Sequence, residues 1–180
     1  MIEQESNNND IAKRFDISRI DFDLLRREFA KTKKKNLLIT DLDELIQTRL
    51  DSMLKENPSR VDYYERYQTI IDEYNNEQDR ANIEKTFMDL INLANSMNQE
   101  EKRYVREGFT SDEELSLYDM LFNENLSKED INKIKKVAID LLKKIKAKIS
   151  ELDHWTEKQE TKAEVDTLIG TILWEELPES

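Results

Sequence analysis

The sequence predicts an all-α protein, an irregular bundle of about seven helices. Apolar residues recur at three- and four-residue spacing along most of the chain, which is the period of an amphipathic helix. Only two glycines and two prolines interrupt the 180 residues, whereas a strand-rich domain with many tight turns uses more of both. Hydrophobic and charged residues make up 37% and 38% of the chain. That balance fits helices with broad solvated faces better than buried sheets.

The N-terminal residues 1–19 are polar and rich in asparagine, which predicts a tail or the remnant of an upstream linker. Residues 20–178 are expected to form a helical C-terminal domain. Its first helix carries Phe22, Leu25 and Phe29 on one face and leads into the basic segment KTKKKN.

Local signals delimit the next two helices. Thr40, followed three residues later by Asp43, is a capping pattern that predicts a helix start. Pro58 ends that helix, because the residue before a proline is pushed away from helical angles. Ser59 is expected to cap the third helix. The apolar face of the third helix is predicted to comprise Val61, Tyr64, Tyr67, Ile70, Ile71 and Tyr74.

The helices that follow are predicted in the same way. An apolar stripe that begins at Ile83 indicates one helix, and a short helix around Tyr104 is expected to end at Gly108, in the left-handed conformation that follows many helix termini. Helices are then predicted over 128–150 and 156–176. Two capping boxes precede helices in this part of the chain, namely Ser111 with Glu114 and Ser127 with Asp130.

Charge is unevenly distributed along the chain. The formal net charge of −12 argues against general adsorption to nucleic acid. Between Lys128 and Lys148, however, eight lysines stand against three acids, a local charge of +5. These lysines form either a solvated face or a contact surface for DNA or an acidic protein. The candidate contact residues are Lys31, Lys33, Lys34, Lys35, Lys135, Lys136, Lys143, Lys144 and Trp155.

Residues for chemistry are scarce. Without cysteine, neither a disulfide nor a thiolate metal site can form. The lone His154 cannot supply a two-histidine metal site and is interpreted as packed or solvated. Gly108 and Gly170 stand too far apart to build a phosphate-binding loop. We therefore expect no catalytic, cofactor-binding or metal residue here. Trp174, beside Leu173, is expected to lie in the core, with a binding role as the alternative.

No apolar run is long enough to span a bilayer, and the opening residues do not look like a secretory signal. The expected location is the cytoplasm, with no membrane partner.

A long ordered series of residues resembles a known family. The series runs through "RLDSMLKENPSRVDYYERYQTIIDEYN" up to Asn75, "REGFTSDEELSLYDML" from Arg106 and "LSKEDINKIKKVAIDLLKKIK" from Leu126, and it closes with the segment from Leu152 to Pro178. Together these segments resemble the C-terminal helical region of the R subunit of type I restriction-modification enzymes. The resemblance covers roughly residues 14–178.

The resemblance implies a larger parent protein, an ATP-dependent type I site-specific deoxyribonuclease that uses ATP and Mg in other domains. None of that family's catalytic motifs is present in this chain. In the family, this region is associated with holding the R subunit against the methyltransferase (M) subunit. Three functions remain open at this point: docking onto the methyltransferase core, guiding DNA over a basic surface of the same machine, or acting as an unrelated helical adaptor.

Overall fold

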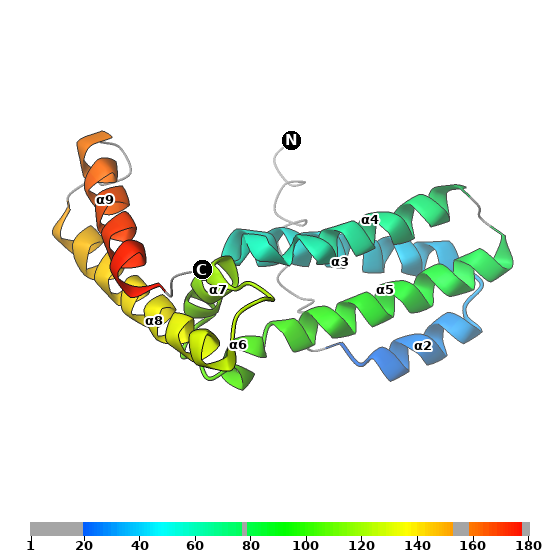
Figure 1. Cartoon of the computed structure of the whole chain (residues 1–180). Coiled ribbons are helices and arrows are strands. Elements are labelled where there is room, and N and C mark those ends of the chain that lie inside the picture. Colours follow the sequence, from blue (N-terminus) through cyan, green and yellow to red (C-terminus); the bar gives the residue numbers. More distant parts are fainter. Residues whose placement is uncertain (1–19, 77–78, 153–158, 178–180) are drawn as a thin grey trace, which may run out of the picture. The chain divides into compact units, whose positions relative to one another are not determined.

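The computed structural model describes residues 20–76, 79–152 and 159–177 (Figure 1). Within them lie eight α-helices, one short 3-10 helix and no strand, which confirms the all-α prediction. The chain divides into two compact units, Met1–Lys102 and Arg103–Ser180.

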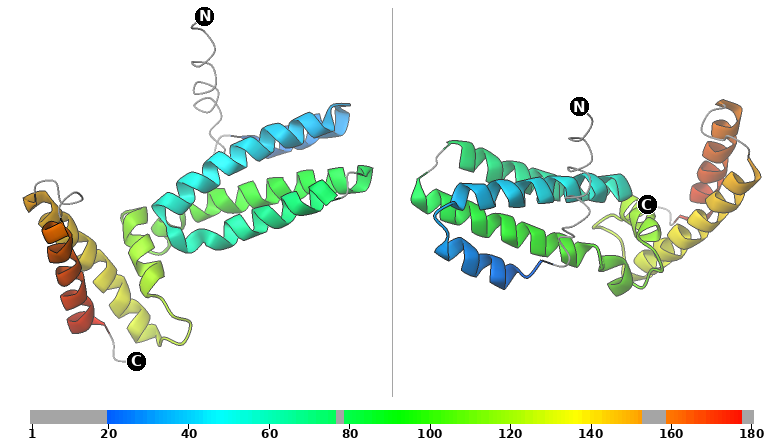
Figure 2. Two further views of the ribbon diagram at one scale, coloured as in Figure 1. Left: turned by 90° about the horizontal axis from the view of Figure 1, so that it is seen from above. Right: turned by 180° about the vertical axis from the view of Figure 1, so that it is seen from behind.

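The described residues of the first unit form four α-helices and the 3-10 helix. These elements are α2 (Phe22–Lys31), α3 (Lys35–Glu56), η2 (Pro58–Arg60), α4 (Val61–Asn76) and α5 (Arg80–Glu100). Helices α3, α4 and α5 run side by side, as the views in Figures 1 and 2 show. The apolar face of α2 contributes Phe29, whose ring stacks on that of Phe87 with the centroids 3.7 Å apart. The remaining fully buried core comes mainly from α3 and α5.

Two predicted helix starts in this unit are wrong. Thr40 lies inside α3, and its hydroxyl donates to the carbonyl oxygen of Asn36 at 3.0 Å instead of capping a helix. The helix starts earlier because Leu38 and Ile39 already follow the helical period and pack in or against the core. Ser59 does not cap α4 either: the side chain of Asn57 accepts a hydrogen bond from the Ser59 backbone N–H at 3.1 Å and starts η2.

The predicted apolar face of α4 is only partly buried. Tyr67 is buried, as predicted, but Val61 and Tyr64 are exposed. Tyr63, which lies between them in the sequence, packs against the core instead, so the covered face of α4 runs through Tyr63, Tyr67, Ile70, Ile71 and Tyr74. The stripe therefore predicted the helix correctly and overestimated how much of it is covered.

Four further helices lie in the part of the second unit that the structure describes. They are α6 (Arg103–Arg106), α7 (Asp112–Leu121), α8 (Lys128–Glu151) and α9 (Gln159–Glu176). Helix α8 packs against α7 on one side and against α9 on another, and α8 and α9 lie side by side in the views of Figures 1 and 2. The core of this unit includes Phe109, Leu115 and Tyr118 together with Ile134 and Ala138 of α8.

The capping signals and the glycine of the second unit predicted the ends of its helices correctly. Gly108 has φ +84°, and the N–H of Phe109 bonds the Tyr104 carbonyl oxygen at 2.8 Å, so the turn closes α6 as expected. The Ser111 and Ser127 hydroxyls accept from the backbone N–H three residues later and cap α7 and α8. The carboxylate of Glu114 accepts from Thr110. The predicted α8 range agrees with the structure to one residue.

Candidate functional site

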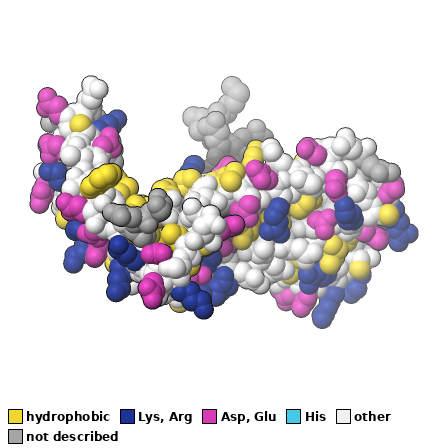
Figure 3. Space-filling view, viewed as in Figure 1, with side chains coloured by type: hydrophobic (Ala, Val, Ile, Leu, Met, Phe, Trp, Pro, Cys, Tyr) yellow, Lys and Arg dark blue, Asp and Glu magenta, His cyan; other side chains and the backbone are white. Residues whose placement is uncertain are grey.

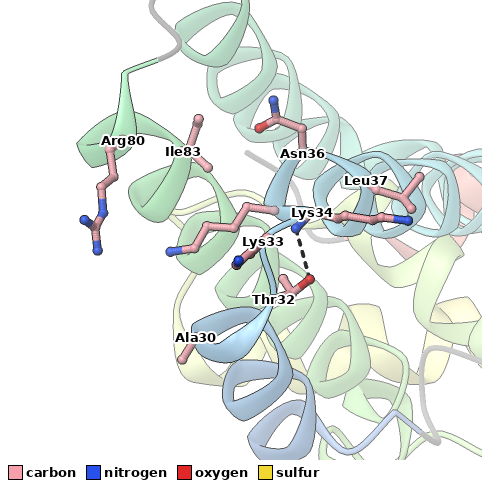
Figure 4. A pocket seen from close by; sticks show the side chains of 9 residues that line it. Ala30, Thr32, Lys33, Lys34, Asn36, Leu37, Arg80 and Ile83 are labelled. Carbon is pink, nitrogen blue, oxygen red and sulfur yellow. Dashed lines mark hydrogen bonds between the residues drawn. The ribbon is translucent and has the colours of Figure 1, made fainter.

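Three lysines are exposed at the turn between α2 and α3. Lys31 ends α2, while Lys33 and Lys34 occupy the turn that precedes α3. The turn is held by Thr32, whose hydroxyl oxygen accepts a hydrogen bond from the Lys34 N–H at 3.1 Å (Figure 4). Helix α3 has no side-chain cap and no acid in its first turn. Its N-terminal N–H groups therefore add partial positive charge to that of the lysines.

A shallow depression adjoins this turn, with Lys33 and Lys34 on one side and Arg80 of α5 on the other (Figure 4). Lys35 also lines it but is engaged within the unit. Its Nζ lies 2.8 Å from Glu84 Oε1 and 4.8 Å from the centre of the Phe29 ring. Arg80 Nε shares the same Glu84 oxygen at 3.3 Å. Hydrogen bonds from Lys35 and then Arg80 lower the pKa of Glu84.

Four lysines of α8 pair with acids elsewhere in the second unit. Lys135 Nζ lies 2.8 Å from Glu107 Oε2 and also donates to the Glu107 carbonyl oxygen at 2.9 Å. It sits about 5.5 Å from the Tyr118 ring centre as well. The hydrogen bond from Lys135 is the main cause of a lowered pKa for Glu107. The other three pairs are Lys144 with Glu176, Lys148 with Glu164, and Lys146 with Glu113.

Two of the predicted contact lysines on α8 point outward. Lys136 and Lys143 are exposed, and no ion pair involves either of them among the described residues. They are seven residues apart and so share one face of the helix, together with Ile139, which is 37% exposed. Figure 3 shows acidic and basic side chains interspersed over the face in view. Two of the candidate contact lysines of α8, Lys135 and Lys144, form ion pairs within the second unit. The other two, Lys136 and Lys143, form no ion pair with the described residues and are exposed to solvent.

Of the two tryptophans and the single histidine, the structure describes only Trp174. His154 and Trp155 lie outside the described residues. Trp174 is 90% exposed, so the expected core position is wrong. The reason is its position on α9: Val165 and Ile172 are the buried residues of that helix, and a residue two positions after Ile172 points to the opposite side.

Two polar contacts, one buried and one part-buried, were not predicted from the sequence. Arg60 Nε bonds Glu100 Oε1 at 3.1 Å, with side chains only 3% and 10% exposed. The Tyr67 hydroxyl donates to Asp43 Oδ1 at 2.7 Å and accepts from Gln47, and burial followed by the bond to Asp43 raises the pKa of Tyr67. Partners so far apart in the chain leave no local signal. Both contacts join helices and serve the fold.

Among the described residues, no group of three or more His, Cys, Asp or Glu is arranged to hold a metal ion. No helix in that part of the chain is long and apolar enough to cross a membrane.

The described residues define an all-α protein of two helical units, with exposed lysines and an exposed tryptophan on its surface. The family comparison is more specific: residues 5–178 match the family described as type I restriction enzyme HindI endonuclease subunit-like, C-terminal. The chain belongs to this family, which confirms the resemblance noted in the sequence. No curated protein and no solved structure matches it.

Proposed function

We propose that this chain is the non-catalytic C-terminal helical module of a type I restriction enzyme R subunit and docks that subunit onto the methyltransferase core. The observation that carries the proposal is the family match over residues 5–178. Family membership also sets aside a helical adaptor unrelated to restriction. In this proposal, ATP, Mg and the nuclease chemistry belong to the rest of the parent protein.

The second unit has features that suit docking. Helices α7 and α9 both pack on α8, and ion pairs join α8 to Glu113 of α7 and to Glu176 of α9, so this surface is formed before a partner binds. Lys136 and Lys143 remain available to meet acidic groups on a partner. Exposed pairs of this kind contribute only about 0–1 kcal/mol each. We therefore expect them to steer association and expect apolar contacts to supply most of the affinity.

The test measures binding of the full chain to the purified methyltransferase core. We expect a Lys136→Glu/Lys143→Glu variant to associate more slowly than the parent, with the difference shrinking as salt rises. A Lys55→Glu/Lys102→Glu variant makes the same change in net charge at exposed lysines of the first unit and should bind like the parent. His154→Ala should be near neutral. Failure of the parent chain to bind the core would refute the docking role.

A second candidate function is guidance of DNA. One observation favours it: Lys31, Lys33 and Lys34 are exposed beside the uncapped N-terminus of α3. Contacts to phosphates release counterions and make binding fall steeply with salt, by about 0.9 in the log–log slope for each phosphate neutralised.

Replacing these three lysines by glutamine should then lower the slope by up to about 3 for duplex DNA of any sequence. Replacing Lys55 and Lys102 by glutamine, which removes two charges at exposed positions elsewhere in the first unit, is the control and should leave the slope unchanged. Equal salt slopes for parent and triple variant, or no DNA binding by the parent, would refute this second function.

A further inference from the structure

The outer face of α9 carries a line of small residues that ends in an exposed tryptophan. Ala163, Thr167, Gly170 and Trp174 follow one another at intervals of four, three and four residues, so they lie along one side of the helix. All four are exposed. The opposite side of α9 holds Val165 and Ile172, which are buried where the second unit packs. The line therefore faces away from α8.

The second unit, where it is described, does not require a glycine at position 170 for its own fold. Gly170 lies inside an 18-residue helix, where glycine is less favourable than alanine. A Cβ at this position would meet nothing within 4 Å, and no positive φ requires a glycine there. What the missing side chain does provide is a place where another backbone can come close to the helix axis.

Trp174 supplies the apolar area that such a contact needs. At 90% exposure it is the most exposed large hydrophobic side chain among the described residues. Tryptophan is enriched among the residues that dominate binding energy, because its large rigid surface is buried at a small entropic cost. Small residues followed by a large anchor provide both the close approach and the contact area for a helix laid along α9.

The charges around this line indicate what can lie on it. Glu164 and Glu176 of α9 are paired with lysines of α8. Glu160 and Asp166 flank the line, are exposed, and have no ion pair among the described residues, while Lys162 is the only basic residue of α9. A negative rim disfavours nucleic acid and anionic lipid and favours a partner with Lys or Arg at its edges.

We propose that the outer face of α9, formed by Ala163, Thr167, Gly170 and Trp174, binds a partner-protein helix whose small or apolar stripe is flanked by basic residues. This proposal rests on the docking function above and places the helix on the methyltransferase core. It assigns the contact to α9, with the outward lysines of α8 as a separate steering surface.

The experiment uses the full chain and the purified methyltransferase core. Trp174→Ala removes the anchor, and Gly170→Leu fills the place of close approach with a side chain whose Cβ meets nothing within 4 Å inside the unit. We expect each change to weaken binding about 30-fold, the size typical of a hot spot. The control Ala81→Leu adds the same kind of bulk at an exposed position of α5 in the first unit and should bind like the parent.

A spectroscopic readout follows the anchor directly. In a Trp155→Phe background Trp174 is the only tryptophan, and its emission should shift to shorter wavelength when the core covers it. If the parent binds while Trp174→Ala and Gly170→Leu bind equally well and the emission stays unshifted, the α9 proposal is overturned and docking stands. If the parent does not bind, both fall. Concentration-dependent dimers of the chain that Gly170→Leu abolishes would overturn it in favour of a second copy as the occupant.

Discussion

The buried pair between Arg60 and Glu100 should be among the most sensitive points of the first unit. It joins η2, at the α3–α4 connection, to the last residue of α5. Both side chains are at most one-tenth exposed, so water screens the two charges little. Glu100→Gln keeps the shape of the side chain and removes its charge, which leaves the Arg60 guanidinium buried without that counter-charge.

The expected magnitude follows from the burial. Removing one member of a buried ion pair costs about 3–5 kcal/mol, because the remaining charge is left uncompensated. Glutamine can still accept the hydrogen bond from Arg60 Nε, so we expect the lower end, about 3 kcal/mol. A domain of this size is stabilised by only about 5–15 kcal/mol in total. The loss should therefore be plain in a urea titration.

The assay is urea unfolding followed by far-ultraviolet circular dichroism, with hydrogen exchange of α3 and α5 amides to place the effect in the first unit. The control is Glu73→Gln, which breaks the pair between Glu73 and Lys85 of α4 and α5, where both side chains are about half exposed. Its midpoint should stay within error of the parent. Equal midpoints for Glu100→Gln and Glu73→Gln would refute the argument from burial.

Three further predictions concern other contacts. Lys135 lowers the pKa of Glu107, so the folded state releases the proton of this carboxyl group more readily than the unfolded state does. The stability of the protein should therefore fall as the pH drops below about 4.5. Glu107→Gln should weaken this acid dependence in acid-unfolding curves. The pKa of Tyr67 is raised, so its contribution to stability has the opposite pH dependence and should be lost as the pH rises above about 10. Tyr67→Phe should cost about 1.5 kcal/mol in urea unfolding, through the lost bond to Asp43. It should also remove one late-titrating tyrosine from an absorbance titration, while Tyr118, whose pKa is raised by burial, remains. Gly170→Ala should raise the stability of the isolated chain by about 0.5–1 kcal/mol, since its Cβ meets no neighbour, and a loss in thermal or urea unfolding would show that α9 needs glycine for its own fold.

Elements defined by local chemistry could be predicted from the sequence. Ser111 and Ser127 cap helices because their hydroxyls reach backbone groups three residues away, and Gly108 adopts a conformation that most other residues avoid. Each of these signals is complete within a few residues. The helix start predicted at Thr40 was wrong, because a threonine hydroxyl can equally donate a hydrogen bond to a carbonyl oxygen of its own helix.

Contacts between residues that are distant in the sequence could not be predicted from local sequence patterns. Arg60 and Glu100 are forty residues apart, and nothing near either residue indicates the other. The exposure of Trp174 depends on which side of α9 faces α8, and a shift of two residues, onto the position of Ile172, would have buried it. In the candidate site, Lys31, Lys33 and Lys34 are exposed, whereas Lys35, Lys135 and Lys144 are engaged by Glu84, Glu107 and Glu176.

The ion pairs change where positive charge is concentrated. The segment 128–148 has a charge of +5 in the sequence, but four acids outside it, Glu107, Glu113, Glu164 and Glu176, pair with its lysines and reduce the local excess to about +1.

The turn between α2 and α3 keeps more of its charge. Lys35 and Arg80 share the single carboxylate of Glu84, and Lys31, Lys33 and Lys34 remain next to the positive end of α3. A polyanion should therefore prefer this turn to the longer lysine helix. The two proposed contacts then use different units, so binding of DNA at the turn and docking through α9 need not compete for the same residues.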